Sequence, residues 1–149
     1  MIEFVQATKD DVLSIYPQTA QWDSYEFGRS VFEKDLVPLA DRAIAIREDG
    51  WCIGAYGLIV LWPGVARAWG MFSTQLLKNH GSVLALHIVK DLRRAEKVGV
   101  RRIEATTATN HMEARAFLRW LGFQAEGLMR AYSPDGADAY LFAKVSNVV

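Results

Sequence analysis

Hydrophobic and polar residues alternate over several short stretches in the first half of the chain, and a turn signal closes each stretch. The stretches that predict strands are residues 2–7, 42–47, 51–62 and 65–73. Glu48-Asp49-Gly50 and Pro63-Gly64 separate the last three, which predicts an antiparallel meander. Two helices, each ended by a proline, are expected between the first strand and the meander, over residues 10–16 and 23–36.

The period of the hydrophobic positions changes to that of a helix after the meander. One helical face carries Leu84, Ala85, Ile88, Val89, Leu92 and Ala95, and Gly99 is the expected stop. A strand over 100–107, a short helix over 113–121, and two strands over 124–132 and 139–145 follow. A helix that joins two strands of one sheet makes a parallel crossover. The pattern therefore predicts an α/β fold with a mixed six- or seven-stranded sheet, helices on both faces, and one domain over residues 1–149.

The segment before the main helix, Lys78-Asn79-His80-Gly81-Ser82-Val83, is predicted to be a loop that leads into a helix start. The first amide groups of a helix lack acceptors within the helix, and the helix dipole places partial positive charge there. A glycine keeps the backbone open to a ligand. The segment is therefore a candidate site for an anion such as a phosphate.

Charge and composition narrow the possible partners. The chain has 149 residues, and its 17 basic and 17 acidic residues cancel, which gives no general attraction to nucleic acid or to a membrane surface. No signal peptide or membrane-spanning run is recognisable, so we expect a cytoplasmic protein. Cys52 lies in an apolar run and is interpreted as a core residue, and the three scattered histidines predict no metal site.

The order of the elements, together with Asn110 and the stretch Ala114-Arg115-Ala116-Phe117-Leu118-Arg119-Trp120-Leu121-Gly122-Phe123, resembles the GCN5-related N-acetyltransferase (GNAT) superfamily. The resemblance implies acetyl-CoA as cofactor, with its pyrophosphate on the loop amides and its pantetheine arm between two splayed parallel strands. The family's loop pattern has Gln or Arg at its first position, Gly at its second and Gly or Ala at its third. In this sequence those positions hold Lys78, Gly81 and Val83. The residues that it implies for cofactor binding are Phe72, Ser73, Thr74, Lys78, Asn79, His80, Gly81, Ser82, Val83, Asn110 and Arg115.

Acetyl transfer to an amine needs a base, an acid and a polarised thioester carbonyl. In much of the family the acid is a tyrosine at the position of Leu118, so Tyr132 or Tyr140 on the final hairpin would have to replace it. Glu104 and His111 are the candidate bases. The alternation of the strand also allows Glu104 to face solvent or another charge, and a lone histidine in a loop, such as His111, is more often a surface residue. Backbone amides at residues 72–74 are candidates to polarise the carbonyl.

Two functions remain open from the sequence. The first is an N-acetyltransferase that acts on a small-molecule or peptide amine. The second is a GNAT-fold protein without transfer activity that acts by binding or assembly, as a homo-oligomer or in a virion, because small acetyltransferase-like phage proteins resemble this chain around residues 67–73 and 117–122. Six basic and two acidic residues between His87 and Arg102 suit coenzyme A phosphates or form the solvated face of a helix.

Overall fold

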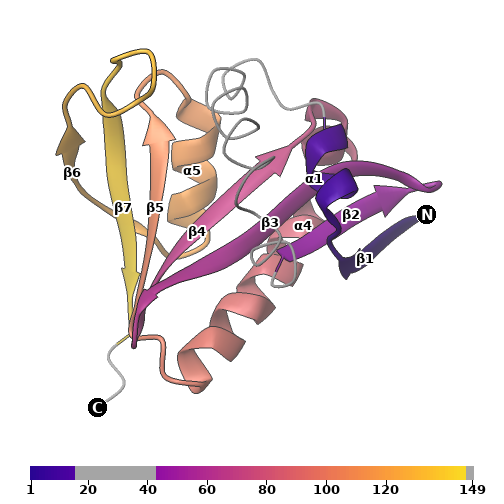
Figure 1. Cartoon of the computed structure of the whole chain (residues 1–149), viewed down its shortest axis with the longest axis horizontal. Coiled ribbons are helices and arrows are strands. Elements are labelled where there is room, and N and C mark those ends of the chain that lie inside the picture. The colour runs from indigo at the N-terminus through magenta and orange to yellow at the C-terminus, as the bar shows by residue number, and fades with distance from the viewer. Residues whose placement is uncertain (16–42, 147–149) are drawn as a thin grey trace. The chain divides into compact units, whose positions relative to one another are not determined.

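The computed structural model describes residues 1–15 and 43–146. These residues include a mixed seven-stranded sheet with the order β1-β2-β3-β4-β5-β7-β6 (Figure 1). The strands are β1 (Ile2–Gln6), β2 (Ala43–Glu48), β3 (Trp51–Trp62), β4 (Val65–Phe72), β5 (Arg102–Ala108), β6 (Gln124–Met129) and β7 (Ala139–Val145). The helices are α1 (Lys9–Ser14), α4 (Thr74–Lys97) and α5 (Met112–Trp120). The predicted α/β class and the predicted mixed sheet are confirmed.

Most strand boundaries agree with the sequence pattern. β3 and β7 span the predicted residues, and β4 and β5 run parallel as the helical crossover predicted. β6 ends at Met129 instead of continuing to Tyr132, because Ala131 takes a left-handed conformation (φ 53°) and the Tyr132 amide donates to the carbonyl of Ala137 across the turn. The helix expected over residues 23–36 lies outside the described residues.

The chain forms two compact units. Unit 1 comprises Met1–Leu58 and Trp69–His80, and unit 2 comprises Ile59–Ala68 and Gly81–Val149. Strands β3 and β4 and helix α4 contribute residues to both units. No helix among the described residues has the length and apolar character to cross a membrane.

The core of unit 1 is built from α1 and from small residues of the strands beneath it. Val12 and Ile15 pack with Ala45, Ala55 and Met71, in a cluster that also contains Ala7 and Ala43. Full burial of a Val or Ile side chain contributes about 2 kcal/mol. The amide of Ala7 donates to the carbonyl of Ala43 at 2.9 Å, so the chain before residue 16 and the chain after residue 42 are joined directly.

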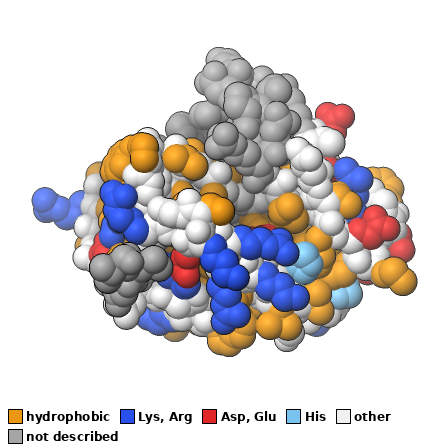
Figure 2. Space-filling view, turned by 90° about the horizontal axis from the view of Figure 1, so that it is seen from below, with side chains coloured by type: hydrophobic (Ala, Val, Ile, Leu, Met, Phe, Trp, Pro, Cys, Tyr) orange, Lys and Arg blue, Asp and Glu red, His pale blue; other side chains and the backbone are white. Residues whose placement is uncertain are grey.

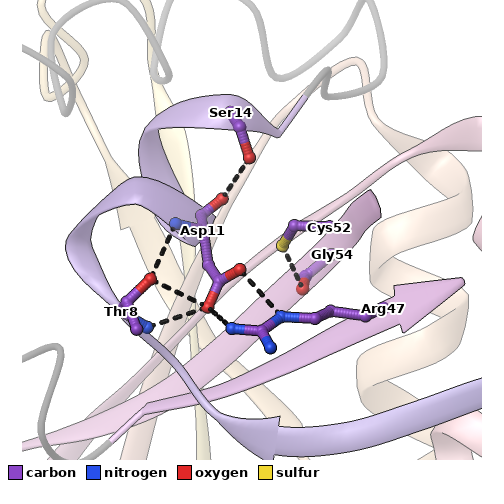
Figure 3. A network of polar contacts seen from close by, with 6 residues as sticks. All are labelled: Thr8, Asp11, Ser14, Arg47, Cys52 and Gly54. Carbon is purple, nitrogen blue, oxygen red and sulfur yellow. Dashed lines mark hydrogen bonds and ion pairs between the residues drawn. The ribbon is translucent and has the colours of Figure 1, made fainter. Parts of the chain in front are cut away.

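A polar network fixes the start of α1 to β2 (Figure 3). Thr8 caps the helix: its hydroxyl accepts from the amide of Asp11 at 3.2 Å, and its own amide donates to the Asp11 carboxylate at 2.9 Å. The same carboxylate accepts two hydrogen bonds from the guanidinium of Arg47, at 3.0 and 2.7 Å. Burial acts to raise the pKa of Asp11, but the hydrogen bonds from Arg47 and Thr8 outweigh it and hold the pKa below its usual value.

Helix α4 corrects the prediction of a loop over residues 78–83. The helix already begins at Thr74, because the hydroxyl of Ser73 accepts from the amide of Leu76 at 3.1 Å and so caps its N-terminus. The stretch from Thr74 to Asn79 is rich in good helix formers. What remains of the loop is a break at His80, whose backbone is not helical (φ −136°, ψ 20°). α4 is therefore two helices joined at His80.

In unit 2, α5 and the end of α4 lie against one face of β7. The guanidinium of Arg115 lies 5.2 Å from the ring centre of Tyr140, and that of Arg119 lies 5.8 Å from the ring centre of Phe142. Lys144, further along the same face, donates to Glu96 of α4 at 2.6 Å. Phe142 is only 1% exposed and is one of the largest fully buried side chains among the described residues.

Candidate functional site

The end of β4 and the start of α4 hold three of the predicted cofactor contacts in unit 1. Phe72 is buried, Ser73 is partly buried and Thr74 is exposed. The amide of Ser73 donates to the carbonyl of Ile53 at 3.0 Å, and the hydroxyl of Ser73 caps α4. Because the amide of Ser73 already has an acceptor, it is poorly placed to polarise a thioester carbonyl.

The break in α4 retains the chemistry that the sequence suggested for an anion site. Lys78 and Asn79 are exposed. The helix that continues after His80 follows a residue whose backbone angles are not helical, which marks a kink between the two parts of α4. A Cβ added to Gly81 would meet no described atom within 4 Å, so the backbone there borders open space. Ser82 and Val83 are exposed, and Val83 retains 47% of its accessible surface.

A carboxylate of unit 1 lies beside the break. Nε2 of His80 is 3.6 Å from Oε2 of Glu48, and Nε2 of Gln75 donates to the same oxygen at 3.2 Å. Glu48 is on β2, so these contacts attach the first part of α4 to the sheet of unit 1. The position of His80 is therefore set by a neighbouring strand as well as by its own helix.

In unit 2, the turn from β5 to α5 carries Asn110 and His111. Asn110 is exposed, whereas His111 is buried, which differs from the surface position considered for it. The amide of His111 donates to the carbonyl of Ala108 at 3.2 Å, and its carbonyl accepts from the amide of Arg115. Burial lowers the pKa of His111, although the charge of Glu113 acts in the opposite direction. The lowered pKa keeps the imidazole mainly neutral near pH 7.

Glu104 belongs to an ion network on the face of β5 opposite to the buried residues Ile103, Ala105 and Thr107. It accepts hydrogen bonds from Arg67 at 3.1 Å and from Arg102 at 2.9 Å, and Arg102 also binds Glu126 at 3.0 and 2.6 Å. Burial acts to raise the pKa of Glu104, but the two guanidinium groups outweigh it and lower the pKa. A carboxylate held in this way is a weak base, so its surroundings favour the charge-pairing interpretation.

The two tyrosines of the final hairpin have different surroundings. Tyr132 follows β6 and is 47% exposed, with its amide bonded to the carbonyl of Ala137. Tyr140 lies on β7 beneath the guanidinium of Arg115 and is partly buried. Leu118, at the position of the usual acid, is a partly buried residue of α5.

Three buried polar atoms of unit 2 have no hydrogen-bond partner among the described residues: Nε of Arg67, Oγ1 of Thr107 and Nε of Arg115. Sequence reasoning missed Thr107, because a threonine in a strand is ordinary. The available signal was its place in the alternation of buried positions with Ile103 and Ala105. Arg115 was expected to contact the cofactor, but the sequence does not reveal that its Nε is buried.

Basic residues accumulate on the exposed side of the second part of α4. Lys90, Arg93, Arg94 and Lys97 are exposed there, and Arg94 pairs with Asp91 at 3.1 Å. In Figure 2, Lys and Arg side chains gather near the middle of the face that is shown. Of the six basic residues in the predicted surplus, these four and Arg101 are exposed, where salt screens their charge, whereas Arg102 is partly buried in ion pairs with Glu104 and Glu126.

Neither a family model nor a curated protein sequence matches this chain. Solved structures do match it. Ribosomal-protein-alanine N-acetyltransferase from Brucella melitensis is 15% identical, with a TM-score of 0.70 over 96% of this chain and 99% of that one. Ard1 from Thermoplasma volcanium is 14% identical, with a TM-score of 0.74 over 99% of both chains. A GNAT-family acetyltransferase from Streptococcus pneumoniae is 15% identical, with a TM-score of 0.67 over 99% of this chain and 100% of that one. The chain therefore has the fold of GNAT acetyltransferases, as its sequence resemblance predicted.

Proposed function

We propose that the chain is an N-acetyltransferase that transfers the acetyl group of acetyl-CoA to an amine of a small molecule or a peptide. The observation that carries the proposal is the short parallel ladder between β4 and β5. It comprises the pairs of Val65 with Arg102, Ala66 with Ile103 and Arg67 with Glu104, whereas β5 continues to Ala108. Beyond Glu104, the backbone groups of β5 on the side that pairs with β4 are not part of the ladder. The amides of a pantetheine arm would pair with these groups.

The break in α4 supports the same proposal. The amides of Ser82 and Val83 follow the non-helical residue His80 and border open space at Gly81, as binding of a pyrophosphate requires. Lys78, in unit 1, is exposed and remains a predicted cofactor contact. Asn110 is exposed in the turn that follows β5 and remains a predicted cofactor contact.

The transfer reaction requires the amine to lose one proton and the sulfur of coenzyme A to gain one. The nitrogen lone pair attacks the thioester carbon, the C–S bond breaks, and coenzyme A leaves as a thiolate that takes up a proton. Of the predicted bases, His111 is neutral near pH 7, whereas Glu104 is held by two guanidinium groups. We therefore assign proton uptake to His111 and protonation of the thiolate to the exposed phenol of Tyr132.

Calorimetric titration with acetyl-CoA, followed by measurement of free thiol release with a panel of amines, tests the proposal. The panel includes peptide N-termini and polyamines. We expect saturable binding and thiol release that depends on at least one amine. Absence of binding at millimolar acetyl-CoA contradicts the proposal, and binding without release for any amine contradicts the transfer step.

A further inference from the structure

We propose that the exposed face of the second part of α4 binds an acidic segment of a partner protein. The site, here called the α4 line, consists of Leu86, Lys90, Arg93 and Lys97, all within unit 2. From the sequence, its three cations suit coenzyme A phosphates or form the solvated face of a helix. Their alignment, their ion pairing and the exposed leucine before them favour a peptide ligand.

The four residues of the α4 line follow one another along a single stripe of the helix. They are separated by four, three and four positions, and a helix of 3.6 residues per turn places such positions above one another. All four are exposed, whereas Ile88 and Leu92, on the other side of the helix, are buried. The line is about 17 Å long and one side chain wide, which matches a short peptide segment better than the plane of a membrane.

The cations of the α4 line have no carboxylate partner on their own helix. The second part of α4 contains two acidic residues, and both are used elsewhere: Asp91 pairs with Arg94 at 3.1 Å, and Glu96 pairs with Lys144 at 2.6 Å. No ion pair joins the three cations to any other described residue. Like charges three and four positions apart on a helix repel each other, so an acidic ligand would stabilise this face.

The exposed leucine distinguishes a peptide from a phosphate polymer. Leu86 is 57% exposed and lies one helical turn before Lys90. In Figure 2, hydrophobic side chains border the gathered Lys and Arg side chains. A protein segment can place an apolar side chain beside its carboxylates, whereas a nucleic acid backbone offers a row of phosphates. The equal numbers of basic and acidic residues in the whole chain also give no general attraction to nucleic acid.

Fluorescence anisotropy with a labelled synthetic helical peptide tests the proposal, in the absence of acetyl-CoA and of any amine substrate. The peptide carries one leucine and three glutamates at the same intervals as the residues of the α4 line, and a control peptide has glutamine in place of each glutamate. We expect saturable binding of the glutamate peptide that weakens as salt is added. The glutamine peptide should bind about tenfold more weakly, because three surface ion pairs are lost.

Two double variants separate the α4 line from the general charge of the protein. Lys90→Gln combined with Arg93→Gln should weaken binding of the glutamate peptide about fivefold. Arg119→Gln combined with Arg130→Gln is the matched control, because it removes the same charge from other exposed positions of unit 2 and should leave the affinity unchanged. Leu86→Ala should weaken binding about threefold through the loss of apolar contact.

Several outcomes would overturn the proposal. They are a glutamate peptide that does not bind, equal affinity for the two peptides, and an equal effect of the two double variants. Oligothymidylate and acetyl-CoA are titrated in parallel. Tighter binding of oligothymidylate than of the glutamate peptide, or displacement of the peptide by acetyl-CoA, also overturns the proposal, because the cations would then serve phosphates. Since the peptide is titrated without acetyl-CoA, the result is independent of whether the chain transfers acetyl groups.

Discussion

Arg47 binds Asp11 through two hydrogen bonds, from Nε to Oδ1 at 3.0 Å and from Nη2 to Oδ2 at 2.7 Å. The same carboxylate closes the capping box of α1 by accepting from the amide of Thr8. The Asp11 carboxylate thus accepts hydrogen bonds both from the start of α1 and from Arg47 of β2, and the Asp11 side chain is only 10% exposed.

Replacement of Asp11 by Asn should therefore lower the free energy of unfolding by about 2 kcal/mol at pH 7. The pKa of Asp11 is lower in the folded chain than its usual value near 4. Its contribution is complete above that usual value and is lost as the pH falls through the folded pKa. Urea unfolding at pH 7 and at pH 3 should show that the difference between wild type and variant shrinks at the lower pH. If the difference in the free energy of unfolding is the same at both pH values, the charge of Asp11 is not the cause of the destabilisation.

The backbone at Gly81 permits a sharp test of the proposed phosphate contact. Gly81→Asp should weaken acetyl-CoA binding at least tenfold, because a carboxylate at the new helix start repels the pyrophosphate. Gly81→Ala is the control: its Cβ meets no described atom within 4 Å, so binding should persist while stability rises by about 0.5–1 kcal/mol. Calorimetry and thermal unfolding measure the two effects. Equal affinity in Gly81→Asp would place the phosphates elsewhere.

Val83 presents a branched side chain at the position where the GNAT pattern has Gly or Ala. Val83→Ala should bind acetyl-CoA about threefold more tightly, because an exposed obstacle is removed from the proposed pyrophosphate site. Leu86→Ala, three residues further along α4 and 57% exposed, is the matched control and should leave the affinity unchanged. An equal gain in both variants would indicate an effect on helix stability alone.

The pH dependence of transfer tests His111. Burial lowers its pKa from the usual value near 6.5, so the imidazole stays in its basic form down to a pH below that value. We expect kcat/KM to fall only as the pH drops through this lowered pKa, and His111→Gln to reduce it about 100-fold at pH 7. Thiol release between pH 5 and pH 8 measures both effects. A variant with the wild-type rate and profile would exclude His111 as the base.

The thiol of Cys52 should be unreactive in the folded protein. It donates to the carbonyl of Gly54 at 3.3 Å, and burial raises its pKa to about 11, so almost none is thiolate at pH 8 (Figure 3). A disulfide reagent should label it slowly in the native state and rapidly in urea. Fast native labelling would contradict its interpretation as a core residue.

The strands could be predicted from the sequence because their alternation is local. β3 is bounded by Gly50 and Pro63, and β7 follows the turn at Pro134, so their limits needed no distant information. The start of α4 could not be predicted in the same way. Asn79-His80-Gly81 has the composition of a loop, whereas Ser73 caps a helix that continues through Asn79 and is broken only at His80.

The candidate site depends on contacts that a linear pattern does not contain. Glu104 meets Arg67 only because the register of β4 and β5 places them opposite each other. The burial of Oγ1 of Thr107 and of Nε of Arg115 likewise depends on the pairing of β5 with β7 and on the packing of α5 against Tyr140. Residue types could be proposed from the sequence, but their partners could not.

The hydrogen bond from Ala7 to Ala43 and the ion pair of Asp11 with Arg47 fix two points of unit 1 that lie far apart along the chain. Both contacts link the chain that directly follows β1 to β2, the strand with which β1 pairs. A shift of β1 by one residue along β2 would break the hydrogen bond between Ala7 and Ala43 and move Asp11 away from Arg47. The two contacts therefore hold the register of the β1–β2 pair.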